Sequence, residues 1–422
     1  MFLERGNTGT VISGWGQVMK TKFYLAVLLT FGIGLFQTVA KASEPKNLAA
    51  AENGFAFKLL KELAAEQPGT NIFISPYSAA TVLQMVANGA AGKTKTEMHQ
   101  VLGTKTLSDA AVNQASQLIA KSLNDRTTNI ILTTGHAIWY RKGASVKPSF
   151  LTLNPRFSET TVAPMDFADP HYVDIINAWA SEKTHGRITQ IADGRDDPEF
   201  LRLFLANAVY FKAGWLEPFD TNETKDRPFH LHGGIEKNVP MMTQAKTFSY
   251  LQETGYQAVR LPYEDPSLAM YIVLPETNSG PEKLLRTIDG DAWQRIINPR
   301  FSDKEGVLFL PRFKLGYSVE LNQTLESLGM KLPFNREKAD FSGIGPDLNI
   351  SRILQKTYAE VNETGTEAGA VTAVTMWDST GPGPARPEPF HMVVDRPFLF
   401  LIEDSRIQTI LFMGVIFYPG AN

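Results

Sequence analysis

The sequence predicts an α+β fold, because helical patterns cluster early in the chain and strand patterns cluster late. Residues 47–66 place apolar side chains at helical spacing, which is typical of a helix packed on a core. Residues 204–215, FLANAVYFKAGW, form an apolar run of the kind found in a buried central strand. Residues 396–419 carry two apolar segments around a polar turn, as in a β-hairpin. This order favours large antiparallel or mixed sheets.

Local signals set the remaining elements. Residues 71–92 predict a short strand and then a helix, which Ser75 caps and Pro76 opens. Residues 169–188 predict an amphipathic helix that ends at Gly186. Periodicity and composition assign the other segments: helices over residues 107–124 and 318–330, the second ending at Gly329, and strands near residues 129–141, 239–242, 257–262, 268–274 and 307–314.

Composition is that of a globular protein and argues against several function classes. The chain has 422 residues, of which 43% are hydrophobic and 20% charged, with a net charge of −3. Lysine and arginine are scattered, so no nucleic-acid partner is expected. Cysteine is absent from the sequence, which excludes disulfides, a thiol nucleophile and a cysteine-based zinc site.

The N-terminal region predicts export. From Met19 the chain has a positive start, an apolar run over residues 23–36 and a small-x-small motif at residues 40–42, directly before Ser43. We therefore expect a signal peptide over residues 19–42, preceded by an upstream start extension over residues 1–18. The mature domain would cover residues 43–422, in the periplasm or outside the cell. A membrane anchor is the alternative, although the apolar run is short for a span.

Motifs of common active sites are missing from the sequence. It contains no GxSxG, HExxH, P-loop or GxGxxG pattern, and the seven histidines are dispersed. His230 and His232 are two residues apart in a strand-like segment, so a metal pair is an alternative to two solvated histidines. The residues favour a protein that is not an enzyme and needs no cofactor or metal.

Several stretches, in the same order, resemble the signature blocks of one family, the serpins, and most closely those of exported bacterial members. The matching segments are residues 71–98, 205–230, 310–330, 339–344, 359–374 and 394–419, so the resemblance covers almost the whole mature chain. It implies a single α+β domain of three sheets and eight or nine helices, with an exposed reactive-centre loop at about residues 363–393.

The resemblance also implies a mechanism. A serine protease cleaves the loop, residues about 365–379 insert as a strand into the large sheet, and the acyl-enzyme is trapped. A non-inhibitory serpin, which acts as a binding or chaperone-like protein on the same fold, is the alternative function.

The hinge of the loop fits insertion when its side chains are read in strand phase. Alternate positions from residue 366 to residue 374 are Thr, Ala, Ala, Thr and Val, all small or β-branched, while Glu367 falls on the opposite face. A flexible Ala/Gly/Thr linker is the competing interpretation, but it explains the small size and not the phase. The hinge residues are Glu363, Gly365, Thr366, Glu367, Ala368, Gly369, Ala370, Val371 and Thr372.

Other positions are assigned through the resemblance. A polar cluster where the sheet opens comprises Ser75, Ser78 and Asn207, Trp215 lies at the top of that opening, and Arg312 pairs with Glu363 at the origin of the loop. The family commonly has a histidine where this chain has Gln355, which cannot titrate.

The scissile bond is placed at Ser379–Thr380 by the usual length of the loop, and Met376, Trp377 and Arg386 are rival sites. A serine before the cut favours an elastase-like or subtilisin-like serine protease as partner, with a cysteine protease as an alternative. Lys121 is the one basic residue of the helix over 107–124, so a heparin site is not expected. We expect a monomer, with polymerisation by exchange of loop and sheet as an alternative assembly.

Overall fold

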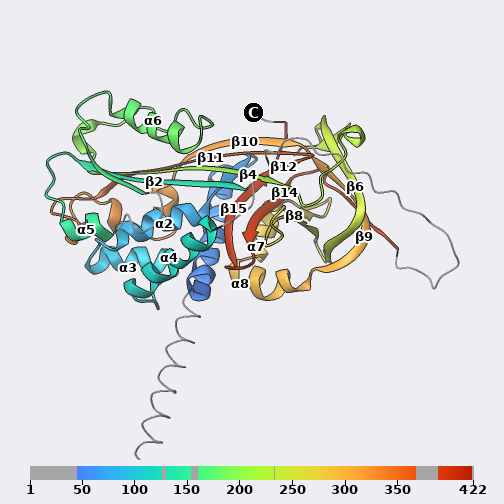
Figure 1. Cartoon of the computed structure of the whole chain (residues 1–422), viewed down its shortest axis with the longest axis horizontal. Coiled ribbons are helices and arrows are strands. Elements are labelled where there is room, and N and C mark those ends of the chain that lie inside the picture. The colour runs from blue at the N-terminus through green and yellow to red at the C-terminus, as the bar shows by residue number, and fades with distance from the viewer. Residues whose placement is uncertain (1–44, 126–129, 154–159, 232, 367–387, 421–422) are drawn as a thin grey trace, which may run out of the picture. The chain divides into compact units, whose positions relative to one another are not determined.

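A computed structural model describes residues 45–125, 130–153, 160–231, 233–366 and 388–420 (Figure 1). These residues belong to a unit that spans Pro45–Asn422. The expected signal peptide, most of the expected loop and the scissile bond lie outside the described residues. Within the described residues, no helix is long and apolar enough to cross a membrane.

A six-stranded sheet crosses the unit. Its order is β10 (Phe313–Glu320), β11 (Ile350–Asn362), β12 (Gly365–Thr366), β4 (Leu203–Gly214), β2 (Ile131–Arg141) and β3 (Thr160–Met165). β4 and β11 also pair directly and in parallel along much of their length. β12 is a short strand held between them at one end.

A nine-stranded sheet packs beneath the first and supplies most of the core. Along its path lie β1 (Ile72–Ile74), β15 (Thr409–Ile416), β14 (Phe398–Asp404), β8 (Leu268–Pro275), β7 (Tyr256–Pro262), β6 (Glu236–Glu253), β9 (Ser302–Pro311) and β13 (Phe390–Val393), while β5 (Lys225–His230) pairs with β6. The strands β5, β6, β9 and β13 form a third set that remains hydrogen-bonded to the second, because β6 is long enough to join them.

Helices cover both faces of the six-stranded sheet. α6 (Tyr172–Lys183) lies on its outer face, and α2 (Pro76–Ala87) lies on its inner face (Figure 1). The helix over residues 45–66 packs into the inner core. The remaining helices are α3 (Gly92–Val101), α4 (Asp109–Asn124), α5 (Pro148–Leu153), α7 (Pro281–Thr287), α8 (Gly290–Ala292) and α9 (Asn322–Ser327), with short helical turns at η2 (Pro198–Phe200), η3 (Thr221–Glu223), η4 (Trp293–Ile297), η5 (Asn298–Arg300) and η6 (Leu332–Phe334).

The two faces of β4 show why its sequence is apolar throughout. Leu203, Leu205 and Val209 belong to the inner core with α2, whereas Phe204 and Ala206 belong to a smaller core beneath α6. A strand buried on both faces needs apolar residues in both phases. The α+β prediction is confirmed, and β4 lies where the apolar run predicts it.

Several predicted boundaries are wrong. The helix expected over residues 169–188 ends at Lys183, because His185 and Gly186 adopt positive φ values of 51° and 79° and reverse the chain. Residues 318–320 are strand and not helix, because the inward–outward alternation of β10 continues to Glu320, and α9 is correspondingly short. The segment 307–314 spans two strands, β9 and β10, and residues 239–242 are a part of the longer β6.

Candidate functional site

The candidate site is the seam between β4 and β11, the two central strands of the six-stranded sheet. The strands pair from Leu203 with Ile350, at what we call the lower end, to Tyr210 with Tyr358. Beyond Tyr358 the strands part, and β12 occupies the upper end of the gap between them. The seam is therefore closed along most of its length and already occupied at its upper end.

β12 is the second arm of a tight hairpin whose first arm is β11. Asn362 pairs with Gly365 and Val361 pairs with Thr366. Gly365 has a φ of +150°, and a Cβ there would lie 2.2 Å from the carbonyl oxygen of Ala213. Glycine is required at this position, because any side chain would collide with the backbone of β4.

Thr366 follows Gly365 in β12 and places its side chain in the core. Its side chain is fully buried, and its hydroxyl lies 2.9 Å from the Tyr263 hydroxyl. It stands opposite Ala213, which belongs to the inner core. Because directly opposed residues share a face, Thr366 points inward.

A buried acid fixes the hairpin turn. The side chain of Glu363 is only 4% exposed and forms an ion pair with Arg312, whose Nε donates a hydrogen bond of 2.6 Å to Oε1. The Thr224 hydroxyl also donates to the same carboxylate, and the amide of Phe219 donates to the Glu363 carbonyl at 2.8 Å. Charge-assisted hydrogen bonds of this kind offset the desolvation of the acid.

Trp215 covers the upper end of the seam. Its indole Nε1 donates to the carbonyl of Asn362 at 2.9 Å, and its amide donates to the carbonyl of Thr364 at 3.0 Å. Its ring stacks on Tyr263 with centroids 4.7 Å apart and an interplanar angle of 10°. Trp215 thus binds the turn of the hairpin, and Tyr263, on which its ring stacks, contacts Thr366.

A polar cluster lies on the inner face of the sheet, against the middle of the seam. Gln355 exchanges two hydrogen bonds with the backbone of Ser75, at 3.0 and 2.9 Å, and the Ser75 hydroxyl donates to the carbonyl of Leu411 at 2.8 Å. Asn207, the partner of Gln355 across the seam, donates to the carbonyl of Ser78 at 3.3 Å. The N-terminal turn of α2 therefore binds both strands of the seam from the inner face of the sheet.

His136 belongs to this cluster and was missed in the sequence. It lies on β2 opposite Asn207, and its Nε2 is 3.0 Å from the hydroxyl of Ser78. Nδ1 of His136 and Oδ1 of Asn207 are buried and have no hydrogen-bond partner among the described residues. Burial lowers the pKa of His136 to about 4, so the ring is neutral at physiological pH. The signal in the sequence that could have revealed His136 is its position on the inward-facing phase of the β-rich segment 129–141.

The structure thus brings together Ser75, Ser78, Asn207 and Gln355 beneath the seam, and Trp215, Arg312 and Glu363 at its upper end. The predicted hinge residues from Glu367 to Thr372, the bond Ser379–Thr380 and the rivals Met376, Trp377 and Arg386 lie outside the described residues. His232 also lies outside them, while His230 is within 3.1 Å of Glu236. In the described part of the chain, no cluster of histidine and acidic residues could hold a metal.

Comparison with known proteins identifies this arrangement. The family model described as serpin (serine protease inhibitor) matches residues 50–419. The chain belongs to the serpin family. Serpin B6 of Pongo abelii is 36% identical to it over 381 residues, which cover 87% of this chain and 98% of the relative. The leukocyte elastase inhibitor of Sus scrofa is 32% identical over 388 residues, which cover 89% and 100% of the two chains.

The solved structures contain the same fold. Human thyroxine-binding globulin, solved with its hormone, superposes with a TM-score of 0.81 at 26% identity and covers 90% of this serpin and 100% of that chain. Serpins as a family are protease inhibitors and not enzymes, and this chain is a member of that family. The predicted family and fold are confirmed.

Proposed function

We propose that this serpin inhibits a serine protease as a suicide substrate, by inserting its cleaved loop into the seam between β4 and β11. The observation that carries the proposal is the position of β12. Gly365 and Thr366 already pair with β4 on one side and with β11 on the other, antiparallel to both. A strand that continued from Thr366 in the same register would separate β4 from β11 and replace their direct pairing.

The register of β12 can be extended residue by residue. Thr366 pairs with Ala213 and with Val361, so each step forward along the loop moves one step back along both strands. Six steps bring Thr372 opposite Asn207 and Gln355. Thr372 would then place a hydroxyl beside the Oδ1 of Asn207, a buried acceptor that has no partner in the described part of the chain.

Side-chain size along the extended register also supports insertion. Three steps from Thr366 bring Gly369 opposite Tyr210 on β4 and Tyr358 on β11, whose ring centroids are 6.4 Å apart. The residue without a side chain would thus enter between the two tyrosines. Glu367, on the same outward phase, would stand opposite Lys212.

The chemistry follows that of an ordinary proteolytic acylation. The protease serine attacks the carbonyl carbon of Ser379, the amine of Thr380 leaves with a proton, and an ester joins the protease to the inhibitor. Roughly ten inserted residues would form hydrogen bonds on both sides, each with a net gain of about 0.5–1.5 kcal/mol. A displacement of catalytic groups by ~1 Å lowers a rate by ~100-fold, which is enough to stall deacylation.

Target and location belong to the same proposal. Ser379 at the cleavage position and the similarity to a leukocyte elastase inhibitor support an elastase-like or subtilisin-like target.

The N-terminal sequence supports export, with a mature chain that starts at Ser43. N-terminal sequencing of the protein recovered from medium and periplasm tests the export proposal, and a start at Met1 or Met19 contradicts it.

One experiment separates inhibition from the alternative role of a binding serpin, which the likeness to thyroxine-binding globulin keeps in view. The mature protein is incubated with elastase-like, subtilisin-like and trypsin-like proteases and analysed on denaturing gels. We expect a covalent complex with the first two and a shift of the cut product to a higher melting temperature. Cleavage without complex or gain in stability would exclude suicide inhibition.

A further inference from the structure

A connecting segment on the outer face of the sheet bridges the lower half of the seam. This segment, residues 184–202, leads from α6 to β4, and we call it the strap. On the β11 side, Lys356 donates a hydrogen bond of 2.6 Å to the carbonyl of Gln190 in the strap. The guanidinium of Arg187 in the strap lies 5.8 Å from the ring centre of Tyr358.

The strap is also fixed on the other side of the seam. The side chain of Asn177 on α6 accepts hydrogen bonds from the amides of Ile191 and Ala192, at 2.7 and 2.9 Å, and donates to the carbonyl of Ala192. Arg141 on β2 donates to the carbonyl of Leu201 at 2.9 Å. α6 and β2 both lie on the β4 side of the seam, so the strap is anchored on both sides.

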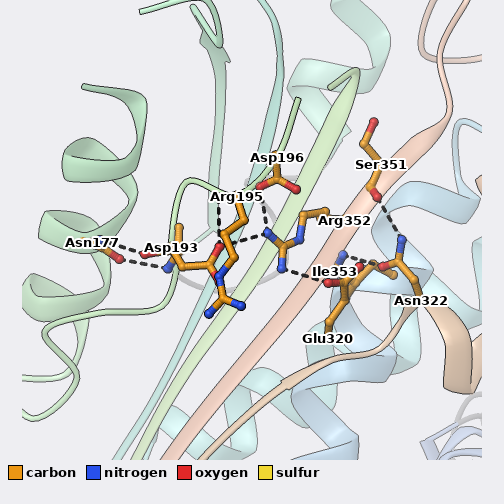
Figure 2. Close-up of polar contacts among 10 residues, drawn as sticks. Asn177, Asp193, Arg195, Asp196, Glu320, Asn322, Ser351, Arg352 and Ile353 are labelled. Carbon is orange, nitrogen blue, oxygen red and sulfur yellow. Dashed lines mark hydrogen bonds and ion pairs between the residues drawn. The ribbon is translucent and has the colours of Figure 1, made fainter. Parts of the chain in front are cut away.

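Arg352 of β11 makes an ion pair across the seam. Its Nη1 is 2.7 Å from Asp196 and 3.5 Å from Asp193, both in the strap, and its Nη2 is 2.8 Å from Glu320 of β10 (Figure 2). The side chains of Arg352 and Asp196 are each 14% exposed, so solvent screens this pair less than an exposed one.

These contacts differ in what happens to them when the seam opens. β10 pairs with β11, so the bond from Arg352 to Glu320 stays within one half of the sheet. Asp196 lies in the strap, which Asn177 binds to α6 and which continues directly into β4, so its bond to Arg352 joins the two halves. Separating β4 from β11 must therefore break or stretch the contact with Asp196 and leave the contact with Glu320 intact.

We propose that Arg352 and Asp196 form a latch that holds the lower end of the seam shut, and that release of the latch limits the final stage of insertion. This inference rests on the proposed function. In the register of β12, nine steps from Thr366 bring residue 375 level with Arg352. The first residues of the loop enter above the latch, and the last ones need it open.

Uptake of synthetic peptides by the intact full-length protein tests the latch. A short peptide, residues 367–371, ends above Arg352, and a long peptide, residues 367–378, passes it. Both start after Thr366, which β12 already holds in the seam. Asp196→Asn removes the charge that crosses the seam, whereas Glu320→Gln removes a charge from the same arginine within one half of the sheet. Uptake is followed by the gain in thermal stability and by native gel mobility.

We expect Asp196→Asn to take up the long peptide about tenfold faster than the wild type and the short peptide at an unchanged rate. Glu320→Gln should stay within about twofold of the wild type for both peptides. If Asp196→Asn does not fold, Asn177→Ala replaces it in the test. Asn177→Ala frees the strap from α6 and should accelerate uptake of the long peptide in the same way.

Two results would overturn the latch. Equal effects of Asp196→Asn and Glu320→Gln would show that crossing the seam does not matter, and equal acceleration of both peptides by Asp196→Asn would show a general loss of stability. In either case uptake by the wild type would still support insertion. Failure of the wild type and every variant to take up the long peptide would refute insertion itself, and the latch with it.

Discussion

Replacing Thr366 by arginine should convert the inhibitor into a substrate of its target protease. Thr366 is fully buried in the resting protein and contacts Tyr263, so β12 must leave the seam to accommodate a guanidinium. Burying a charge without a partner costs several kcal/mol, and the Tyr263 hydroxyl loses its partner as well. Cleavage needs only access to the loop and should continue.

The consequence is kinetic, because insertion competes with hydrolysis of the acyl-enzyme. A rise of ~1.4 kcal/mol in the barrier to insertion slows that step tenfold. The cost of burying the arginine exceeds this value, so most acyl-enzymes should be hydrolysed before they are trapped. We therefore expect the number of inhibitor molecules consumed per protease inactivated to rise at least tenfold.

Glu367→Arg is the matched control, since it introduces the same side chain one residue later. In the register of β12 this residue falls on the outer face opposite Lys212, where a long side chain remains in solvent. The assay is a titration of protease with each variant. If Glu367→Arg raises the consumption of inhibitor as much as Thr366→Arg, the assignment of inward and outward faces is wrong.

Two further predictions concern specificity and stability. Ser379→Arg should redirect inhibition toward trypsin-like proteases with an unchanged fold, and retained elastase-like inhibition without a trypsin-like complex would move the scissile bond elsewhere. Glu52 is fully buried, and burial raises its pKa to about 8, so its contribution to stability is present below pH 4.5 and is lost as pH rises through 8. Glu52→Gln should therefore raise the free energy of unfolding at pH 7 by about 1–3 kcal/mol, with a smaller gain at pH 5, as measured by denaturant titration.

Local patterns were sufficient where a segment's own residues decide its structure. Ser75 caps α2 by accepting a hydrogen bond from the amide of Ser78, as the Ser-Pro pair predicts. The apolar run of β4 is buried on both faces because cores lie above and below it. Residues 318–320 were misassigned because the helical pattern that follows them masked the alternation of β10.

The candidate site required information that the sequence order does not carry. Family resemblance located Ser75, Asn207 and Gln355, but the partner of each is far away along the chain. Ser75 and Gln355, for example, are 280 residues apart. Arg352 and Asp196 are 156 residues apart, and each looks like an ordinary surface charge in its own segment. Their relation depends on the register of β4 and β11, which sheet pairing sets and local patterns do not.

His136 should make the closed seam sensitive to acid. Its pKa is about 4 in the folded protein and near 6.5 in the unfolded chain, so below pH 6.5 the unfolded chain binds a proton that the native state excludes. The contribution of His136 to the free energy of unfolding is therefore fully present above pH 6.5. It falls by about 3 kcal/mol as pH drops to 4. Its closest polar neighbours, Ser78 and Asn207, carry no charge that could stabilise the imidazolium.

Glu52 opposes this trend, because its native form gains stability as pH falls from 8 to 4.5. The two effects cancel in part between pH 6.5 and 4.5, and a stability profile of the wild type alone would conceal both. His136→Gln keeps a side-chain amide near Ser78 but cannot titrate. In the Glu52→Gln background, denaturant titrations should show a loss of stability between pH 6.5 and 4 that disappears when His136→Gln is added. An acid-induced loss of the same size in both proteins would assign the sensitivity to other groups, and the neutral histidine beneath the seam would have no part in it.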